Sequence, residues 1–403
     1  MNSIWKRNGL ILLFFLFLGG SFGAGWYLGA QNATEVPIEG VINTELGADD
    51  GVDFSLFWDA WRKIQTQYVG ADELDFQEMV FGAISGMVDS LDDPYTVFMD
   101  PEDAKKFAED VQGVFGGVGM EIGIREGELK VIAPLDGTPA AVAGLRPGDS
   151  IIKIDDMFSK GLTIDGAVTL IRGDPGTQVT LHIFRDGWLS AKDFTITRDL
   201  IEVPSITWEI REGNVAYIRL HQFFQKAGTD FNKTANEVLR SDADRIVLDM
   251  RSNPGGFLDV SVHIAGWFLE RGDLVTLEDF GGKRENIEYK AKGNAKLKSY
   301  PIVVLINEGS ASASEILAGA LRDQNGATLL GKQSFGKGSV QELANLKNGA
   351  TLKVTVANWL TPNGAHITDV GLTPDVEVDI TEEDFNQELD PQIDKAIELV
   401  KKL

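Results

Sequence analysis

The segment PIVVLINEGSASASEILAGALRD, residues 301–323, decides the fold of this chain. It opens with the apolar run 302–306, which is short enough to form one buried strand. Residues 315–323 then predict a helix, and a turn of small residues separates the two. That turn holds three serines: Ser310, Ser312 and Ser314. A serine at a strand-to-helix turn is well placed as a nucleophile.

A second segment, SFGKGSVQ at residues 334–341, follows a further short strand at 327–330. Its Lys337 stands between two glycines, and Gln341 follows four residues later. A serine hydroxyl needs a base, and a free lysine with a pKa of about 10.4 is charged, but burial can lower that value. Lys337 is therefore a candidate base. Gln341 is a candidate partner that would orient the amine without adding charge.

The residues leave the choice of serine open. Ser312 and Glu315 have the spacing of a capping box, so Ser312 can also be an ordinary helix N-cap. The same helix end favours developing negative charge, and an oxyanion needs two donors. The amide of Ala313 is one candidate donor. A second candidate is Gly255 or Gly256 in the turn DMRSNPGG at 249–256, although these glycines can equally serve a plain helix entry.

Length and composition narrow the function. The 403 residues suffice for several domains, and 43% hydrophobic and 24% charged residues are typical of globular proteins. A net charge of −24 argues against nucleic-acid binding. The absence of cysteine excludes disulfides and thiolate chemistry. The four histidines have no metal-ligand spacing, so we expect no metal and no cofactor: His182, His221, His263 and His366.

The amino terminus predicts a membrane anchor. Lys6 and Arg7 precede an uncharged stretch from Gly9 to Ala30, long enough to span a bilayer as a helix. We expect residues 1–30 to form an uncleaved signal anchor, with a cleaved signal peptide as the alternative. The basic residues then stay in the cytoplasm, and the bulk of the chain lies outside it, on the periplasmic side.

The rest of the chain predicts an α/β multidomain protein. Residues 31–52 are an acidic linker, and aromatic residues at helical spacing predict a helical region at 53–112. Apolar strands alternate with helices through residues 200–380, which indicates an α/β core. Residues 381–403 end in an amphipathic helix.

Residues 113–199 resemble a PDZ domain. The specific part of the match is GTPAAVAGLRPGDSI at 137–151, preceded by the glycine loop FGGVGM at 115–120. The resemblance implies that the loop offers backbone N–H groups to the carboxylate of a peptide C-terminus, and that the peptide adds as a strand beside residues 121–124. The loop residues concerned are Gly117, Val118, Gly119 and Met120.

From about residue 54 to the end, the chain resembles the carboxyl-terminal processing peptidases, the tail-specific serine proteases of the S41 type with a PDZ domain. The resemblance lies in NEGSASASEI at 307–316, SFGKGSVQ at 334–341, DMRSNPGG at 249–256, Asp93-Pro94-Tyr95 and DVGLTPD at 369–375. It implies a ClpP/crotonase-like core with Ser312 as nucleophile, Lys337 as general base and Gln341 as its partner. The family often has an arginine after Gly364, where this chain has Ala365.

The function expected from this resemblance is serine endopeptidase activity on extracytoplasmic proteins that the PDZ domain selects by their C-termini. A regulatory adaptor and a homo-oligomer are expected partners. Arg172, at the end of the predicted PDZ helix, is a candidate contact between the PDZ domain and the core, or else a plain helix cap. Two rivals are an inactive membrane-tethered PDZ scaffold and a chymotrypsin-like PDZ protease with a histidine base.

Overall fold

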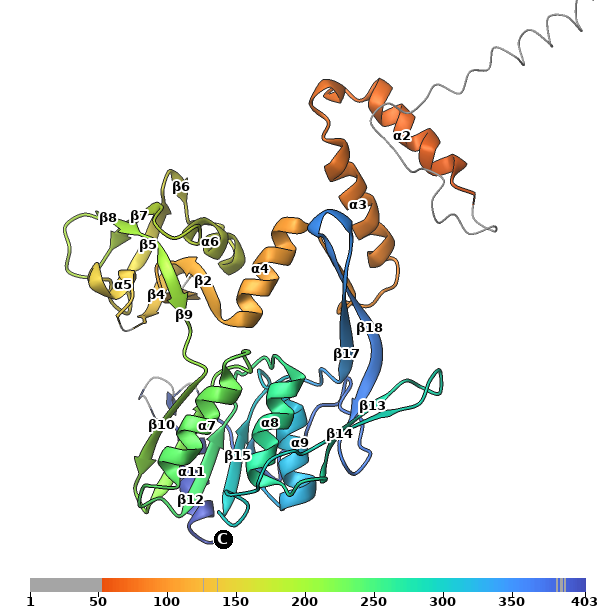
Figure 1. The fold of residues 1–403 in the computed structure, drawn as a ribbon. Helices are drawn as coiled ribbons and strands as arrows, with labels where there is room; N and C mark the ends of the chain where they lie inside the picture. Colours follow the sequence, from red (N-terminus) through yellow and green to blue (C-terminus); the bar gives the residue numbers. More distant parts are fainter. Residues whose placement is uncertain (1–52, 126, 136, 382, 385–386, 388) are drawn as a thin grey trace, which may run out of the picture. The chain divides into compact units, whose positions relative to one another are not determined.

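The structure is a computed structural model that describes residues 53–403, apart from residues 126, 136, 382, 385, 386 and 388 (Figure 1). It divides into two compact units, one up to Gly86 and one from Met87. The predicted membrane anchor and linker lie outside the described residues. Within the described part, the structure contains no helix of the length and apolarity that a membrane crossing requires.

The first unit contains the predicted helix α2 (Ser55–Gln67), the short 3-10 helix η1 (Ala71–Glu73) and most of the second predicted helix, α3 (Phe76–Asp89). Trp61 is 4% exposed, and its ring lies 6.1 Å from that of Phe76, centroid to centroid. The aromatic spacing of the sequence therefore packs the two helices against each other.

The second unit begins with the short strand β1 (Val97–Met99) and helix α4 (Pro101–Gln112). Asp100 caps α4, because its carboxylate accepts hydrogen bonds from the backbone N–H groups of Glu102 and Asp103. The helix ends at Gly113, which has a φ of 72°.

The PDZ domain follows. Its sheet has the order β3-β4-β5-β7-β8, with β6 paired to β5. The strands are β3 (Met120–Arg125), β4 (Glu128–Pro134), β5 (Ser150–Ile154), β6 (Met157–Phe158), β7 (Gln178–Phe184) and β8 (Lys192–Thr197). Helices α5 (Pro139–Val142) and α6 (Ile164–Ile171) complete the domain. Alternate residues of β7, such as Val179 and Leu181, are fully buried in its own core.

The glycine loop differs from the prediction at its start. Strand β2 (Val114–Gly117) pairs with β9 (Asp199–Glu202) in a two-stranded ribbon, so part of the expected loop is extended strand. Gly116 permits this, because a Cβ there would lie 2.2 Å from the carbonyl oxygen of Gly173.

The α/β core contains a six-stranded sheet with the order β10-β11-β12-β15-β16-β19, parallel except for the β10–β11 pair. Its strands are β10 (Ile206–Arg211), β11 (Val215–Leu220), β12 (Arg245–Asp249), β15 (Ile302–Ile306), β16 (Thr328–Gly331) and β19 (Val376–Glu377). Its helices are α7 (Ala227–Val238), α8 (Leu258–Phe268), α9 (Ala313–Asn325) and α11 (Pro391–Val400).

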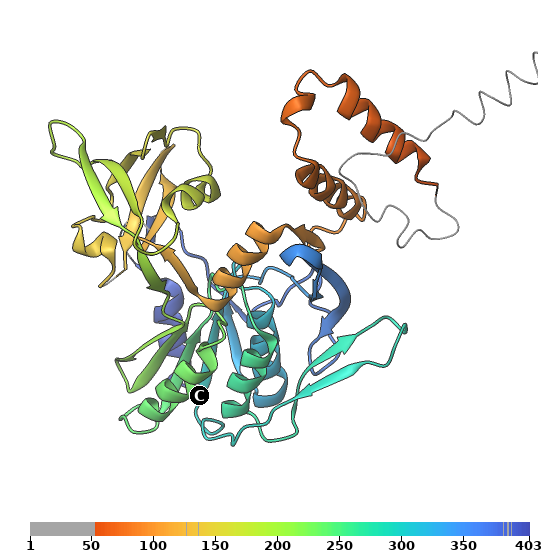
Figure 2. The same ribbon diagram turned by 45° about the horizontal axis from the view of Figure 1, so that its top comes forward.

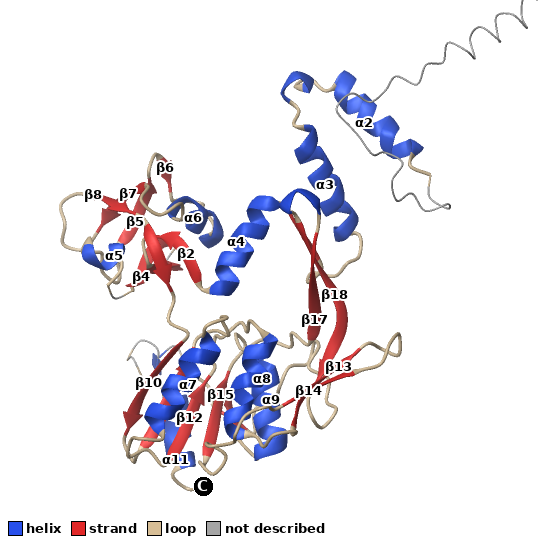
Figure 3. Ribbon diagram, in the orientation of Figure 1, coloured by secondary structure: helices blue, strands red, loops and turns tan. Residues whose placement is uncertain are grey.

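Helices cover both faces of this sheet, which explains why its strands are continuous apolar runs. Ile218 and Leu220 of β11 pack with α7, α8 and α9, whereas Val215 and Tyr217 pack on the side of α11. Figures 2 and 3 show the C-terminal helix on the opposite side of the sheet from α7 and α8.

A second sheet stands beside the core, in the order β1-β18-β13-β14 with β17 paired to β18. Besides β1, its strands are β13 (Leu274–Asp279), β14 (Ile287–Lys290), β17 (Ser339–Asn345) and β18 (Thr351–Leu360). Only β18 was expected from the sequence, because the others lack a long apolar run. The remaining 3-10 helix, η2 (Lys347–Gly349), joins β17 to β18.

Candidate active site

The three serines in the turn between β15 and α9 differ in the hydrogen bonds of their hydroxyl groups. The hydroxyl of Ser310 donates to the carbonyl of Met250 at 2.8 Å, and that of Ser314 donates to the carbonyl of Asn253 at 2.9 Å. Both side chains are fully buried. Ser312 is half-buried, and its hydroxyl donates to no acceptor in the described part of the chain. Ser312 is therefore the one serine of this turn with a proton available for chemistry.

The backbone of Ser312 is strained. It has φ 54° and ψ −115° at the N-cap of α9, a conformation that L residues rarely adopt. Such strain is stabilised only by the surrounding structure and gathers at functional sites. The predicted capping box with Glu315 is present, and the Ser312 N–H donates to Oε2 of Glu315 at 2.8 Å. The cap and a catalytic role are compatible, because the box leaves the Ser312 proton free.

Glu315 joins the serine turn to the lysine segment. Its carboxylate is 1% exposed and accepts four hydrogen bonds. Oε1 accepts from the Ser334 hydroxyl at 2.6 Å and the Gly336 N–H at 2.7 Å, and Oε2 accepts from the Lys337 N–H at 3.0 Å as well as from Ser312. Burial raises the pKa of the Glu315 carboxyl, while the four donors act in the opposite direction. No sequence signal beyond the capping box indicated this role.

Lys337 lies in a close-packed loop, as its flanking glycines predicted. A Cβ at Gly336 would lie 3.0 Å from the Gly371 nitrogen, and one at Gly338 would lie 2.1 Å from the Thr368 nitrogen. Burial lowers the pKa of the Lys337 ammonium, and the positive charge of Lys353 lowers it further, whereas Glu315 acts to raise it. The direction is the one that a general base requires.

The ammonium of Lys337 lies 5.4 Å from the ring centroid of Tyr95. With the described residues it forms no hydrogen bond and no ion pair. The expected contact with Ser312 is therefore absent from this conformation of the side chain.

The predicted hydrogen bond between Gln341 and Lys337 is not formed in this structure. Nε2 of Gln341 donates to the Ser339 hydroxyl at 2.7 Å and makes a long contact of 3.5 Å with the Thr355 hydroxyl. The pairing of β17 with β18 shifts register between Val340 and Gln341, and this irregularity changes how Gln341 is presented. The role of Gln341 stays a prediction.

The glycine turn after β12 lies directly against the serine turn. A Cβ at Gly255 would lie 2.9 Å from the Cβ of Ser312 and 3.0 Å from the Ala313 nitrogen. The Gly255 N–H donates to Oδ1 of Asn253 at 2.9 Å. The N–H groups of Gly256 and Ala313 have no acceptor among the described residues. Of the two glycines left open by the sequence, Gly256 therefore has the free donor.

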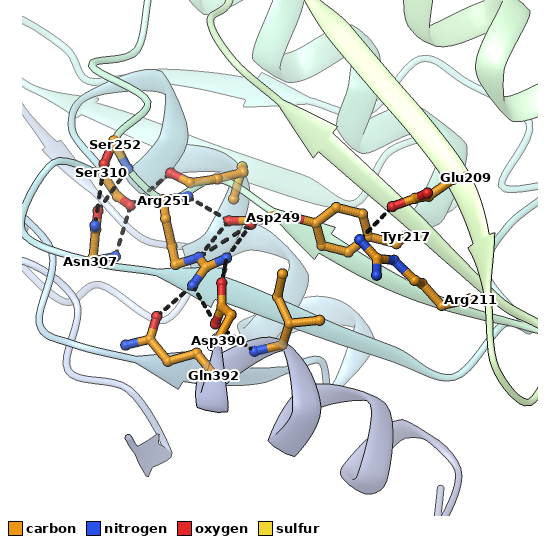
Figure 4. A network of polar contacts seen from close by, with 12 residues as sticks. Glu209, Arg211, Tyr217, Asp249, Arg251, Ser252, Asn307, Ser310, Asp390 and Gln392 are labelled. Carbon is orange, nitrogen blue, oxygen red and sulfur yellow. Dashed lines mark hydrogen bonds and ion pairs between the residues drawn. The ribbon is translucent and has the colours of Figure 1, made fainter. Parts of the chain in front are cut away.

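Arg251, in the same turn, belongs to the motif DMRSNPGG, and the sequence alone indicates no role for it. Its guanidinium is bound between the carboxylates of Asp249 and Asp390, at 2.7 and 2.9 Å, and it also donates to Gln392 at 2.9 Å (Figure 4). Burial disfavours its charge, but the hydrogen bonds with Asp249 and then Asp390 raise its pKa overall. The start of α11 is thereby bound to the glycine turn.

Asp249 completes this network. Its carboxylate is fully buried and also accepts hydrogen bonds from the Tyr217 hydroxyl at 2.6 Å and from the Arg251 backbone N–H at 2.9 Å (Figure 4). Burial and then the charge of Asp249 raise the pKa of Tyr217, so the phenol stays protonated and can donate. A buried charge paired on all sides in this way fixes the direction of the chain after β12.

The PDZ loop has the free donors that the resemblance implies. Val118 and Gly119 use their carbonyl groups to bind Ala140, Leu135 and Thr138, but their N–H groups have no acceptor in the described structure. A cavity of about 90 Å³ adjoins them. It is lined by Phe115, Gly117, Val118, Gly119, Met120, Ile122, Val168, Ile171 and Arg172.

Arg172 is the C-cap residue of α6, and its side chain also contacts a residue outside the PDZ domain. Its guanidinium pairs with Asp110 of α4 at 2.5 Å and lies 4.0 Å above the ring centroid of Phe115. The candidate coupling residue therefore binds the helix that leads into the PDZ domain.

Three of the four histidines have ordinary partners. His182 pairs with Asp193, His221 with Thr207 and His263 with Asn232. Within the residues described, no group of histidine and acidic side chains is arranged to hold a metal ion.

Comparisons with known proteins agree with this architecture. The family described as "Peptidase family S41" matches residues 214–378, "PDZ domain" matches 130–185, and "Activating protease CtpB N-terminal domain" matches 21–103. The chain is 41% identical over 329 residues to a carboxy-terminal-processing protease of Bartonella bacilliformis, covering 80% of this chain and 74% of that protein. It is 36% identical over 322 residues to the carboxy-terminal processing protease CtpA of Bacillus subtilis, covering 80% and 68%.

Among solved structures, the photosystem II D1 C-terminal processing protease is 30% identical, with a TM-score of 0.52, and the match covers 80% of this chain and 92% of that one. The chain belongs to the carboxy-terminal processing proteases of peptidase family S41. It is a serine peptidase with a PDZ domain, as the sequence predicted.

Proposed function

We propose that this protein cleaves peptide bonds with a Ser312–Lys337 dyad. The observation that supports this assignment best is the shared acceptor, Oε2 of Glu315, which holds the backbone of both residues. Ser312 has a free hydroxyl proton, and Lys337 has a lowered pKa. A nucleophile with a free proton and a base with a lowered pKa therefore lie in neighbouring segments.

In the proposed reaction, the neutral amine of Lys337 takes the hydroxyl proton of Ser312 as the serine oxygen attacks a peptide carbonyl. The carbonyl carbon becomes tetrahedral and its oxygen becomes negative. The ammonium of Lys337 then gives its proton to the leaving amine, and an acyl-enzyme remains. Lys337 next deprotonates a water molecule, which attacks the ester, and Ser312 recovers its proton when the acid product leaves.

The oxyanion is stabilised by the N–H groups of Ala313 and Gly256. Ala313 begins α9, so its N–H also lies at the positive end of a helix dipole. Gly255 is the residue that lets this turn approach Ser312. Donors that are already in place need no reorganisation as the negative charge develops.

In the conformation described above, the Lys337 ammonium lies at Tyr95 and Gln341 is bound to Ser339. Formation of the dyad requires a hydrogen bond from the Ser312 hydroxyl to the Lys337 amine, which this conformation lacks. Gln341 becomes its partner if the amide exchanges the Ser339 hydroxyl for the amine.

Substrates are extracytoplasmic proteins bound by their C-termini in the PDZ cavity. The free N–H groups of Val118 and Gly119 bind the terminal carboxylate, and the apolar lining takes the last side chain. Arg172 lines this cavity and pairs with Asp110 of α4. Binding of a peptide in the cavity can therefore affect α4, which lies outside the PDZ domain.

The uncharged stretch from Gly9 to Ala30 anchors the chain in the cytoplasmic membrane, with the peptidase on the periplasmic side. Homo-oligomer formation and a regulatory adaptor are also part of this proposal.

The test uses the full-length chain in detergent with an unfolded protein as substrate. Wild type cleaves it, and Ser312→Ala and Lys337→Ala do not. Thermal unfolding curves of the two variants serve as the control for folding. An inert wild type would favour the scaffold alternative, and full activity of Lys337→Ala would exclude lysine as the base.

A further inference from the structure

The turn Asp93-Pro94-Tyr95-Thr96 has no role in the proposed mechanism, although it lies beside Lys337, the proposed general base. Its Tyr95 ring faces the Lys337 ammonium with the nitrogen 5.4 Å from the ring centroid. Within about 6 Å, a ring face attracts a cation. Among the described residues, the ammonium forms no hydrogen bond or ion pair that competes with this ring.

The same turn also reaches Gln341. The carboxylate of Asp93 accepts from the Tyr95 N–H at 3.0 Å and from the Thr96 hydroxyl at 2.6 Å. The Thr96 hydroxyl accepts from the Thr355 N–H at 3.0 Å, and the Thr355 hydroxyl is in long contact with Gln341. Thr96 is buried, so these hydrogen bonds are shielded from water.

The strand that follows the turn fixes it in place. Strand β1 pairs with β18, with Val97 opposite Lys353, and β18 in turn pairs with β17, which carries Gln341. The turn therefore belongs to the sheet that carries the proposed base partner.

We propose that Tyr95 is a positioning residue for Lys337, and that the turn 93–96 aligns the base and Gln341 together. The inference rests on the proposed function of Lys337. In the reaction, Lys337 becomes an ammonium when it takes the Ser312 proton, and the Tyr95 ring stabilises that charged form until the leaving amine accepts the proton.

Charged groups from neighbouring elements act on both Lys337 and Tyr95. Lys353 of β18 and Glu315 of α9 act on Lys337, in opposite directions. Asp369, Glu315 and Asp93 act on the Tyr95 phenol, whose pKa is raised first by burial and then by these charges. The phenol therefore stays neutral, and Tyr95 acts on Lys337 through the face of its ring.

The test compares Tyr95→Leu, which removes the ring, with Tyr95→Phe, which restores it without the hydroxyl. For the full-length protein, kcat and KM for an unfolded substrate are measured across pH. For Tyr95→Leu we expect kcat to fall about ten-fold with KM unchanged. The acidic limb of its pH profile should move about half a pH unit lower, because the ammonium has lost a stabilising contact.

For Tyr95→Phe we expect the wild-type plateau value of kcat and the wild-type position of the acidic limb of the pH profile. If Tyr95→Leu does not fold, Tyr95→Met replaces it with the same expectation. A limb that stays at the wild-type pH in the ringless variant would overturn the proposal, even with a lower kcat, and so would a Phe variant as impaired as Leu. Lys337→Ala is measured alongside, because activity in that variant refutes the proposed base itself rather than the role of Tyr95.

Discussion

The backbone N–H groups of Ser312 and Lys337 donate to the same oxygen atom, Oε2 of Glu315. In the proposed dyad, the serine hydroxyl and the lysine amine are needed for chemistry, so their hydrogen-bonding capacity cannot be used to fix the two residues. A buried carboxylate holds both through their main chains. The following expectations depend on that arrangement and on the turns around it.

Glu315→Gln should reduce kcat about 100-fold and lower the free energy of unfolding by about 3 kcal/mol. The amide would present an NH₂ group to N–H donors that now face an oxygen. Urea unfolding and steady-state kinetics measure the two effects. Glu308→Gln, an exposed carboxylate in the same loop, is the matched control and should change neither. Wild-type kcat in Glu315→Gln would refute the positioning role.

Gly255→Ala should inactivate the enzyme. Its φ is 98°, and an added Cβ would lie 2.7 Å from the Ala311 carbonyl oxygen and 2.9 Å from the Ser312 Cβ. We expect a loss of about 100-fold in activity, because the serine turn must shift. Gly272→Ala has a similar φ of 100° with no atom in the way, so it isolates backbone strain. It should lose about 1 kcal/mol and keep its activity. Equal activity of the two variants would contradict this account.

Lys337→Met should be inactive but more stable than wild type near neutral pH, by about 1 kcal/mol. The folded state lowers the pKa of Lys337, so the unfolded chain holds more protons between the folded and unfolded pKa values. Wild-type stability from this group therefore rises with pH across that window and is lost as pH falls through the folded pKa. The advantage of Lys337→Met should shrink as pH rises toward about 10.4. Unfolding curves at several pH values measure it, and a constant difference would count against a lysine with a lowered pKa.

Gly119→Ala should weaken binding of a C-terminal peptide at least ten-fold. Its φ is 75°, and an added Cβ would lie 2.4 Å from that of Thr138, whose hydroxyl binds the Gly119 carbonyl. Fluorescence anisotropy on the full-length chain carrying Ser312→Ala avoids cleavage. Gly127→Ala, with a φ of 76° and open space, should bind like the parent. An amidated peptide should bind neither, and tight binding of that peptide would refute carboxylate recognition.

The sequence predicted the elements whose pattern is local. Strand β15 and helix α9 follow from a buried apolar run and a helix start, and the PDZ helix α6 from an amphipathic repeat. Strands β13, β14 and β17 escaped prediction because none has a long apolar run in the sequence. They are defined by pairing: β13 pairs with β14 and β18, and β17 pairs with β18.

The site divides in the same way. The types and spacing of Ser312 and Lys337 were visible, but the choice among the serines needed the hydrogen bonds of Ser310 and Ser314. Gln341 has a suitable spacing in the sequence, yet its amide donates to Ser339, beside a register shift in the pairing of β17 with β18. Spacing along a strand shows what a side chain can reach, and only the pairing shows which neighbour it meets.

The Arg251 network links the chemistry to the order in which the chain is made. Arg251 bonds to Asp390 and Gln392, which come far later in the sequence, at the start of α11. Before those residues leave the ribosome, the guanidinium lacks two of its partners and the turn that carries Gly255 and Gly256 lacks its clamp. In a nascent chain, Ser312 and Lys337 are therefore made before the turn with the proposed oxyanion donors is fixed. We expect the proposed site to be complete only once α11 has docked.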